Sequence, residues 1–318
     1  MGESPAIITV TLNPAIDRII EVDGLVIGSH QMGREALRTA AGKGVNVSTV
    51  LAALGVPSLA TGFLGEETRT FFETQLAGRG IAEEFVTIPG RTRENITLAD
   101  SRTKQETHIR DVGLAVDWKG IDRLGEKLRC LAKPGVIIIF SGSLPPGVAP
   151  GDFANLVTAC MARGARVAVD TQGPALGAIV GMPLWLIKPN AQELSQLAGR
   201  ELRNERQRLD AARLLARGMA NVLLTCGSDG AFLLAEGRTL HGIAPLAPKD
   251  IRSTVGCGDV MLGAYVAGLW RGLDVRHAFT EAVACSAACA MTFAPAAFDP
   301  AAVDACRLNV RITERDSA

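Results

Sequence analysis

Residues 136–147 read VIIIFSGSLPPG, an apolar run of strand length that passes directly into a turn of Ser, Gly and Pro. The same pattern recurs at residues 166–170 (RVAVD), 184–187 (LWLI) and 222–225 (VLLT). Short continuous apolar runs are typical of strands that are buried on both faces of a sheet. Segments rich in Ala and Leu, such as residues 208–217, predict helices between them. This alternation predicts βαβ units and a mostly parallel sheet covered by helices.

The N-terminal third of the chain continues the alternation. Residues 6–12 (AIITVTL) and 59–63 predict strands, and residues 44–54 and 66–78 predict helices. Each of these helical segments ends at a glycine, which commonly closes a helix. The expected architecture is therefore an α/β fold that occupies most of the chain.

Two more polar stretches, residues 16–38 and about 93–114, interrupt this pattern. Alternating residues such as ITLA at positions 96–99 predict half-exposed antiparallel strands. Because the two stretches flank the glycine segment at 42–44, we interpret them as one small lid sheet built from separate pieces. The expected α/β core comprises residues 1–15, 41–91 and 116–318, and the expected lid comprises residues 16–40 and 92–115.

The composition excludes several classes of function. Lys plus Arg and Asp plus Glu number 33 each, so the net charge is zero, whereas general nucleic-acid or membrane-surface binders carry a basic excess. Aromatic residues make up only 4%, which disfavours a base-stacking surface. Apolar runs are of strand length, too short to span a bilayer. We therefore expect neither a nucleic-acid partner nor a membrane.

The cysteine count and the two termini add expectations about location. The chain has seven cysteines, an odd number with no C-x-x-C pair, so we expect neither a disulfide framework nor a zinc knuckle and assign the chain to the reducing cytoplasm. The opening MGESPAIITVTLNP lacks the basic and apolar regions of a secretory signal peptide. The polar tail from about Asn309 is expected to fray.

The strongest signal for chemistry is STVGCGD at residues 253–259, directly before an apolar segment that predicts a helix starting near Asp259. Backbone N–H groups of Gly256, Cys257 and Gly258 can form an anion-binding nest at the positive end of that helix. The nest suits a phosphoryl group in transfer, and Asp259 suits a base toward an attacking hydroxyl. A capped helix without catalytic function fits the same pattern.

A second glycine segment, AGKGVNVS at residues 41–48, also precedes a predicted helix. Gly42 lets the backbone approach a ligand closely, and Lys43 and Asn46 offer hydrogen-bond donors. The segment is not a P-loop, because it lacks the four-residue spacer and the terminal Gly-Lys-Ser/Thr. The structural alternative is a tight loop that enters a helix.

The segment KPNAQE at residues 188–193 follows a predicted strand, at the edge where open α/β sheets place ligands. Asn190 and Glu193 are three residues apart, so a helix starting here puts both on one face. An amide and a carboxylate with their waters suit Mg²⁺, which takes few direct protein ligands. The alternative is an N-cap Asn with a Glu in the first turn.

Three further segments are weak signals when taken singly. SGSLPPG at 141–147 and TCGSDG at 225–230 each follow a strand and can line a pocket or simply turn. RTREN at 91–95 places Arg93 at the edge of the lid, where an Arg is by default a solvated charge.

Taken together and in this order, the segments resemble the PfkB carbohydrate kinase family over nearly the whole chain. AAGKGVNVSTVLAALG is similar to the N-terminal glycine signature of the family, STVGCGDVMLGAYVAG to its C-terminal signature, and KPNAQEL to its N-x-x-E motif. TLNPAIDRII, GSLPPG and GRTREN resemble the branch that acts on phosphorylated ketohexoses. The chain departs from the family at Cys257, which replaces Ala, and at Ser253, which replaces Asp.

The resemblance implies a ribokinase-like three-layer α/β/α sandwich with a mostly parallel sheet and a small β lid. It implies a core that binds ATP, with Mg²⁺ as the essential ion, and a lid that contributes to the sugar site. Because lids of this family often pair across subunits, it also implies a homodimer through the lid. The implied reaction is phosphorylation of a ketohexose monophosphate, with fructose 1-phosphate favoured as the acceptor.

The resemblance also implies residue roles. Asp259 matches the catalytic base, and Gly256, Cys257 and Gly258 match the anion hole. Residues matching the sugar-phosphate site are Asp17, Gly42, Lys43, Asn46, Arg93 and Ser141. Residues matching the nucleotide site are Lys188, Asn190, Thr225, Gly227, Gly230 and Thr254. Asn190 and Glu193 match the magnesium motif, acting through water.

Other acceptors and a non-enzymatic role are the alternatives. Tagatose 6-phosphate or fructose 6-phosphate can replace fructose 1-phosphate, and an unphosphorylated sugar or a nucleoside would need no cation at Arg93. A catalytically dead sensor of sugar phosphate or nucleotide would be favoured by loss of the base or of the nest glycines. All of these residues are present in the chain.

Overall fold

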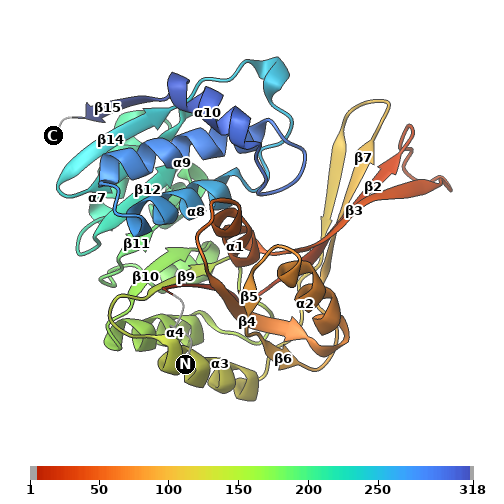
Figure 1. Ribbon diagram of the computed structural model, residues 1–318, viewed down its shortest axis with the longest axis horizontal. Coiled ribbons are helices and arrows are strands. Elements are labelled where there is room, and N and C mark those ends of the chain that lie inside the picture. Colours follow the sequence, from red (N-terminus) through yellow and green to blue (C-terminus); the bar gives the residue numbers. More distant parts are fainter. Residues whose placement is uncertain (1–5, 316–318) are drawn as a thin grey trace.

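The computed structural model describes residues 6–315, in which strands and helices alternate along the chain (Figure 1). The helices are α1 (Lys43–Ala53), α2 (Arg69–Ala77), α3 (Trp118–Leu131), α4 (Pro150–Ala162), α5 (Gly173–Gly177), α6 (Ala191–Leu197), α7 (Glu205–Leu215), α8 (Cys257–Trp270), α9 (Val275–Ala290) and α10 (Pro300–Asn309). The strands are β1 (Ile7–Thr11), β2 (Ala15–Val22), β3 (Gly33–Ala41), β4 (Leu59–Gly65), β5 (Ala82–Glu83), β6 (Val86–Ile88), β7 (Glu94–Asp100), β8 (Glu106–Arg110), β9 (Ile137–Ser141), β10 (Arg166–Asp170), β11 (Leu186–Ile187), β12 (Asn221–Thr225), β13 (Ala231–Ala235), β14 (Arg238–Ile243) and β15 (Arg311–Arg315).

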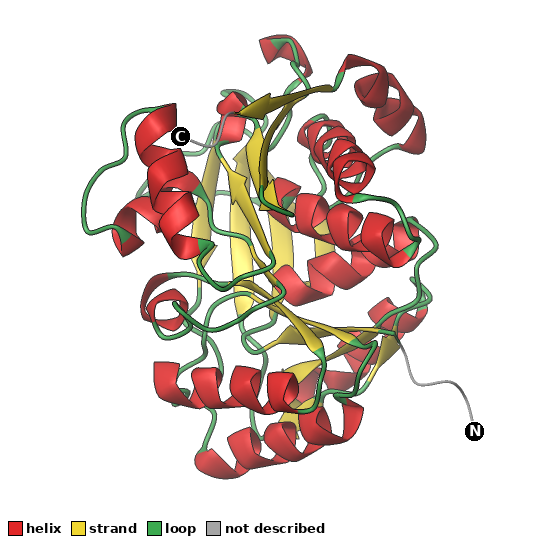
Figure 2. Ribbon diagram, turned by 90° about the vertical axis from the view of Figure 1, so that its left-hand side faces the viewer, coloured by secondary structure: helices red, strands yellow, loops and turns green. Residues whose placement is uncertain are grey.

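The main sheet has the order β15-β14-β13-β12-β11-β10-β9-β1-β4-β5, and β6 pairs with β4. The strands from β12 to β5 are parallel, and β13, β14 and β15 form an antiparallel edge. Figure 2 shows helices on both faces of this sheet. The predicted three-layer α/β/α sandwich with a mostly parallel sheet is confirmed.

The two faces of the sheet carry separate apolar cores because successive strand residues point in opposite directions. Ile8 packs in the core that holds the buried sides of α3, α4 and α7, whereas Ile7 packs against α1, α8 and α9. Ile138 and Ile139 divide between the two cores in the same way. Burial on both faces explains why these strands are mostly apolar, and why the polar exceptions in β1 are the small, buried Thr9 and Thr11.

A second sheet has the order β3-β2-β7-β8 and projects beyond the body of the molecule (Figure 1). The β2–β3 and β7–β8 pairs are antiparallel as expected, but the central pair β2–β7 is parallel, which corrects the expectation of antiparallel strands. The reason is that β2 and β7 both leave the core at one point, where Ile16 N–H donates to Arg93 O over 2.9 Å. We call this sheet the lid sheet.

The C-terminal tail is also different from the expectation of fraying. Residues Arg311–Arg315 form β15, which pairs with β14, while residues 316–318 lie outside the described part of the chain. The edge of β14 offers unpaired backbone groups, which β15 satisfies. Arg238 reinforces the pairing by donating two hydrogen bonds of 3.0 Å to Glu314.

Within residues 6–315, no helix is both long enough and apolar enough to cross a membrane.

Candidate active site

A cavity of about 1060 Å³ lies where the carboxyl ends of the parallel strands meet the base of the lid sheet. Its walls include residues that directly follow β9, β10, β11 and β12, together with Asp17, Asn95 and Arg110 of the lid sheet. Ligands of open α/β sheets bind at this edge. The volume exceeds that of a typical pocket for one small molecule, so the cavity has room for two ligands.

All but one of the residues predicted for the site line this cavity. They are Asp17, Gly42, Lys43, Asn46, Arg93, Lys188, Asn190, Glu193, Thr225, Gly227, Gly230, Thr254, Gly256, Cys257, Gly258 and Asp259. Ser141 instead ends β9 as a buried residue, and its hydroxyl has no hydrogen-bond partner within residues 6–315. Its neighbours Gly142 and Ser143 line the cavity in its place.

The nest at the start of α8 depends on Gly256, which has a φ of 81°. A Cβ atom at this glycine would lie 2.4 Å from the backbone nitrogen of Ala296, so both the conformation and the space require glycine. The helix begins at Cys257, two residues earlier than expected. Gly258 and Asp259 therefore lie in its first turn, where backbone N–H groups have no carbonyl of a preceding turn to bind.

Asp259 is buried, with 5% of its surface exposed, and still borders the cavity. Its Oδ2 accepts a hydrogen bond of 2.7 Å from Nδ2 of Asn46, which lies 213 residues away in the sequence. Burial, and then repulsion from Asp170, raise the pKa of Asp259 to about 6, against the opposing effects of Lys43 and Asn46. A carboxylate whose pKa lies near neutrality is suited to accept a proton from a substrate.

Asp170 is a residue of the site that the sequence analysis missed. It ends β10, is fully buried and forms ion pairs of 3.1 Å with Lys43 and 3.2 Å with Lys188. Although burial acts in the opposite direction, the two lysines hold the pKa of Asp170 below its usual value. The available signal was a charged residue at the end of an apolar strand, RVAVD.

The two lysines present positive charge to the cavity. Burial lowers the pKa of Lys43, but the attraction of Asp170, Asp259 and Glu193 outweighs it and raises the pKa above the ordinary value. A Cβ atom at Gly258 would lie 3.3 Å from Nζ of Lys188, so that ammonium group is adjacent to the nest. Backbone N–H groups and ammonium groups in this arrangement can stabilise the negative charge of a phosphoryl group.

Asn190 and Glu193 form a reciprocal cap at the start of α6. Oδ1 of Asn190 accepts from the backbone N–H of Glu193, and Oε2 of Glu193 accepts from the backbone N–H of Asn190, both over 2.8 Å. The motif therefore forms the N-cap Asn and first-turn Glu that were its structural alternative. Both side chains also line the cavity, and the second carboxylate oxygen of Glu193 remains for a ligand. This hard oxygen donor fits a hydrated Mg²⁺.

The loop after β12 forms another wall of the cavity. Thr225 N–H donates to Pro189 O over 3.1 Å, which places this loop beside the Asn190 motif. Gly230 has a φ of 83°, and a Cβ there would lie 2.3 Å from the carbonyl oxygen of Gly242. Apolar side chains continue this wall, namely Ile243, Ala244, Leu246, Ile251 and Val283. A flat ring with attached phosphates matches such an apolar wall beside glycine loops.

The lid sheet supplies polar groups at the opposite wall. Asn95 Nδ2 donates to Asp17 Oδ1 over 2.8 Å, while the buried Oδ1 of Asn95 has no partner within residues 6–315. Burial raises the pKa of Asp17. The sequence analysis missed Asn95 and Arg110, because single polar residues on an alternating strand carry no distinguishing motif.

Arg93 fastens the base of the lid sheet. Its guanidinium donates to the carbonyl oxygens of Pro14 (3.2 Å), Asp111 (2.9 Å) and Asn13 (2.9 Å). These bonds use three of the five N–H groups of an arginine, so two remain for a ligand.

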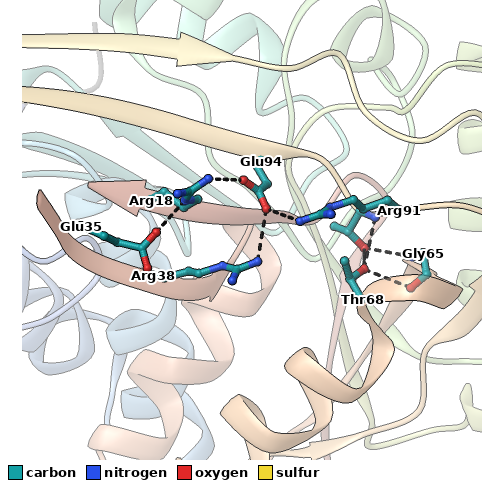
Figure 3. Close-up of polar contacts among 8 residues, drawn as sticks. Arg18, Glu35, Arg38, Gly65, Thr68, Arg91 and Glu94 are labelled. Carbon is teal, nitrogen blue, oxygen red and sulfur yellow. Dashed lines mark hydrogen bonds and ion pairs between the residues drawn. The ribbon is translucent and has the colours of Figure 1, made fainter. Parts of the chain in front are cut away.

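Glu94, next to Arg93, forms a second fastening of the lid sheet. Its carboxylate accepts hydrogen bonds from Arg18, Arg38 and Arg91 (Figure 3). Each of these arginines therefore has a carboxylate partner within the protein.

The cavity thus combines a buried carboxylate with a raised pKa, a glycine turn at a helix start and two lysines, between a glycine-lined wall and the polar lid sheet. The arrangement can remove a proton from a hydroxyl and stabilise negative charge on a phosphoryl group.

Comparison with known proteins gives concordant findings. Residues 10–301 match the family model described as pfkB family carbohydrate kinase. The 1-phosphofructokinase of Rhodobacter capsulatus is 34% identical over 88% of this chain and 89% of its own length. The phosphofructokinase-2 of Escherichia coli, solved in complex with potassium, is 25% identical with a TM-score of 0.90 and covers 96% of this chain and 98% of its own. It has also been solved as a tetrameric inhibited form.

The raised pKa of Asp259 predicts a stability effect. Between pH about 4 and about 6 the folded chain retains a proton that the unfolded chain releases, so the free energy of unfolding falls as the pH rises through this window. Asp259→Asn removes the buried charge and can still accept from Asn46. We expect the variant to be more stable than the parent at pH 8 by roughly 1–3 kcal/mol.

Urea unfolding at pH 8 and pH 4.5 measures this difference. The gain should be much smaller at the lower pH, where the folded parent already holds the proton on Asp259, and it should vanish only below pH about 4. A variant that is less stable than the parent at both pH values would show that the buried charge carries no cost.

Proposed function

This chain belongs to the pfkB family of carbohydrate kinases, and from that premise we propose that it transfers the γ-phosphoryl group of ATP to fructose 1-phosphate. The product is fructose 1,6-bisphosphate. The observation that carries the proposal is the place of Asp259, which lies at the start of α8 with the lid sheet on one side of the cavity and the loop after β12 on the other. The named similarity to a 1-phosphofructokinase supports the choice of acceptor.

In the proposed mechanism, Asp259 accepts the proton of the 6-hydroxyl as that oxygen attacks the γ-phosphorus in line, while the bond from the γ-phosphorus to the β,γ-bridging oxygen breaks and ADP leaves. The first-turn N–H groups of α8 and the ammonium of Lys188 stabilise the charge on the transferring group. Asn190 and Glu193 would hold Mg²⁺ through waters, and the bound ion supplies charge neutralisation to the phosphates of ATP. Thr225, Gly227, Gly230 and Thr254 would position the nucleotide.

The lid, which we take as residues 16–40 and 92–115, would close over the sugar and exclude water as a competing acceptor. Asp17 and Asn95 would bind ring hydroxyls, and Gly42 would let the backbone approach the sugar. The unpartnered Oδ1 of Asn95 supports this role, since a buried acceptor needs a donor.

We propose that the chain forms a homodimer through the lid sheet and works in the cytoplasm. Ile27 and Met32, both in the connection between β2 and β3, are 98% and 96% exposed. Exposed apolar groups of this kind on a projecting sheet favour association with a second copy. Seven free cysteines suit a reducing compartment.

The first prediction concerns the acceptor. Fructose 1-phosphate and fructose 6-phosphate each present a phosphate at one end and a primary hydroxyl at the other, so ring-hydroxyl contacts must distinguish them. A buried hydrogen-bonding group left unpaired by the wrong isomer costs about 1–3 kcal/mol, or roughly tenfold to a hundredfold in kcat/KM. Release of ADP over a panel of sugars and sugar phosphates should be most efficient with fructose 1-phosphate.

A preference for fructose 6-phosphate or tagatose 6-phosphate would contradict the assigned acceptor and leave the kinase class intact. If free sugars turn over best, the phosphosugar assignment fails as a whole. Binding of both ligands without any turnover would favour the sensor.

The second prediction concerns the base. Asp259→Asn should lower kcat at least about a hundredfold while ATP binding survives, because a general base contributes on this order. For the parent enzyme, activity should rise through pH about 6 and level off above it, since only the deprotonated carboxylate accepts the proton. Asp122→Asn, at an exposed position of α3, serves as the matched control and should retain parental kinetics. Normal turnover of the Asp259 variant would remove this residue from the mechanism.

The third prediction concerns assembly. Light scattering at micromolar concentration should give twice the chain mass of 33.4 kDa. Changing both Ile27 and Met32 to Ser should shift the mass toward the monomer, because the apolar contact is lost. A monomeric parent would contradict a dimer formed through the lid sheet. So would a tetramer whose mass is unchanged by these substitutions.

A further inference from the structure

Three polar residues form a row across the lid sheet. Asp17 of β2 pairs in register with Asn95 of β7, and Asn95 pairs in register with Arg110 of β8. Residues directly opposite each other in a sheet project from the same face. All three also line the large cavity, so the row faces the proposed sugar site.

Arg110 differs from the other arginines of this sheet. Arg34 donates to Glu21, and Arg18 and Arg38 donate to the carboxylate of Glu94. Just before β7, Arg91 also donates to Glu94 and Arg93 donates to three backbone carbonyls. Arg110 is exposed, and its guanidinium makes no hydrogen bond or ion pair with residues 6–315. All five of its N–H groups therefore remain for a ligand.

The charges around this row favour an anion. After burial, the positive charge of Arg110 is the next cause that lowers the pKa of Arg93, so the two guanidinium groups are close enough to repel each other. Asp17 is the carboxylate that interacts electrostatically with both guanidinium groups, and burial raises the pKa of Asp17. A phosphate dianion between the two guanidinium groups would relieve their repulsion and accept paired hydrogen bonds.

We propose that Arg110 binds the phosphate of the acceptor sugar together with the two N–H groups that Arg93 has left, a proposal that rests on the kinase function above. Because Arg110 lies on β8, at the edge of the lid sheet, its contact makes phosphate binding a part of lid closure. A sugar without phosphate leaves both guanidinium groups unpaired. Arg110 thereby contributes to the preference for sugar phosphates over free sugars.

The test compares Arg110→Gln with Lys104→Gln, which removes the same charge from the turn before β8, outside the cavity. Loss of a charge-assisted hydrogen bond should raise the KM for fructose 1-phosphate roughly tenfold to a hundredfold in the first variant. Its KM for ATP should stay within about twofold of the parent, and its kcat/KM for free fructose should not fall. The Lys104 variant should match the parent throughout.

Further measurements separate a binding role from a structural one. Arg110→Lys should recover part of the affinity for fructose 1-phosphate, since it restores the charge without the planar fork. The melting temperature of the Arg110 variants should equal that of the parent. An unchanged KM for fructose 1-phosphate, or an equal rise in both KM values, would overturn the role of Arg110. A parent enzyme that uses no sugar phosphate would instead overturn the proposed function.

Discussion

The ion pairs of Asp170 with Lys43 and Lys188 are the interaction on which the site depends. They join the end of β10, the first turn of α1 and the segment after β11, three parts of the chain that have no local reason to meet. A fully buried carboxylate that loses its partner costs about 3–5 kcal/mol, so each lysine is held in place by the need to compensate that charge. Conversely, the buried carboxylate keeps both lysines charged at the cavity wall.

The same carboxylate also tunes the proposed base. Asp170 repels the charge of Asp259 and adds to the effect of burial on its pKa. Asn46 opposes this shift by donating to Asp259, which fixes the orientation of the carboxylate. The protein thus keeps Asp170 ionised by pairing it with two lysines, and it shifts the pKa of Asp259 toward neutrality. A base prepared in this way reduces the stability of the fold, because activity requires a charge that burial disfavours.

In the lid sheet, the residues that hold the sheet in place are different from the row of residues that faces the cavity. Glu94 binds three arginines and so ties β2, β3 and β7 to one another (Figure 3). Arg93 binds three carbonyl groups, two of them in the segment between β1 and β2, and so fixes the base of the sheet to the core. In the row that faces the cavity, by contrast, Oδ1 of Asn95 and the guanidinium of Arg110 make no hydrogen bond with residues 6–315. Unsatisfied polar groups persist in a fold where a ligand satisfies them.

The sequence by itself determined the parallel sheet, because strands buried on both faces are read as short, mostly apolar runs. It also predicted that Asp259, the nest glycines and the Asn190 motif belong to one site, and the structure places all of them in the cavity wall, since each depends on backbone conformation or spacing within a few residues. The tertiary structure alone decided the partners of Asp170, the contact between Asn46 and Asp259, and the parallel pairing of β2 with β7. These contacts join segments far apart in the chain, and their geometry follows from which strands lie side by side and in what register, which local patterns do not encode.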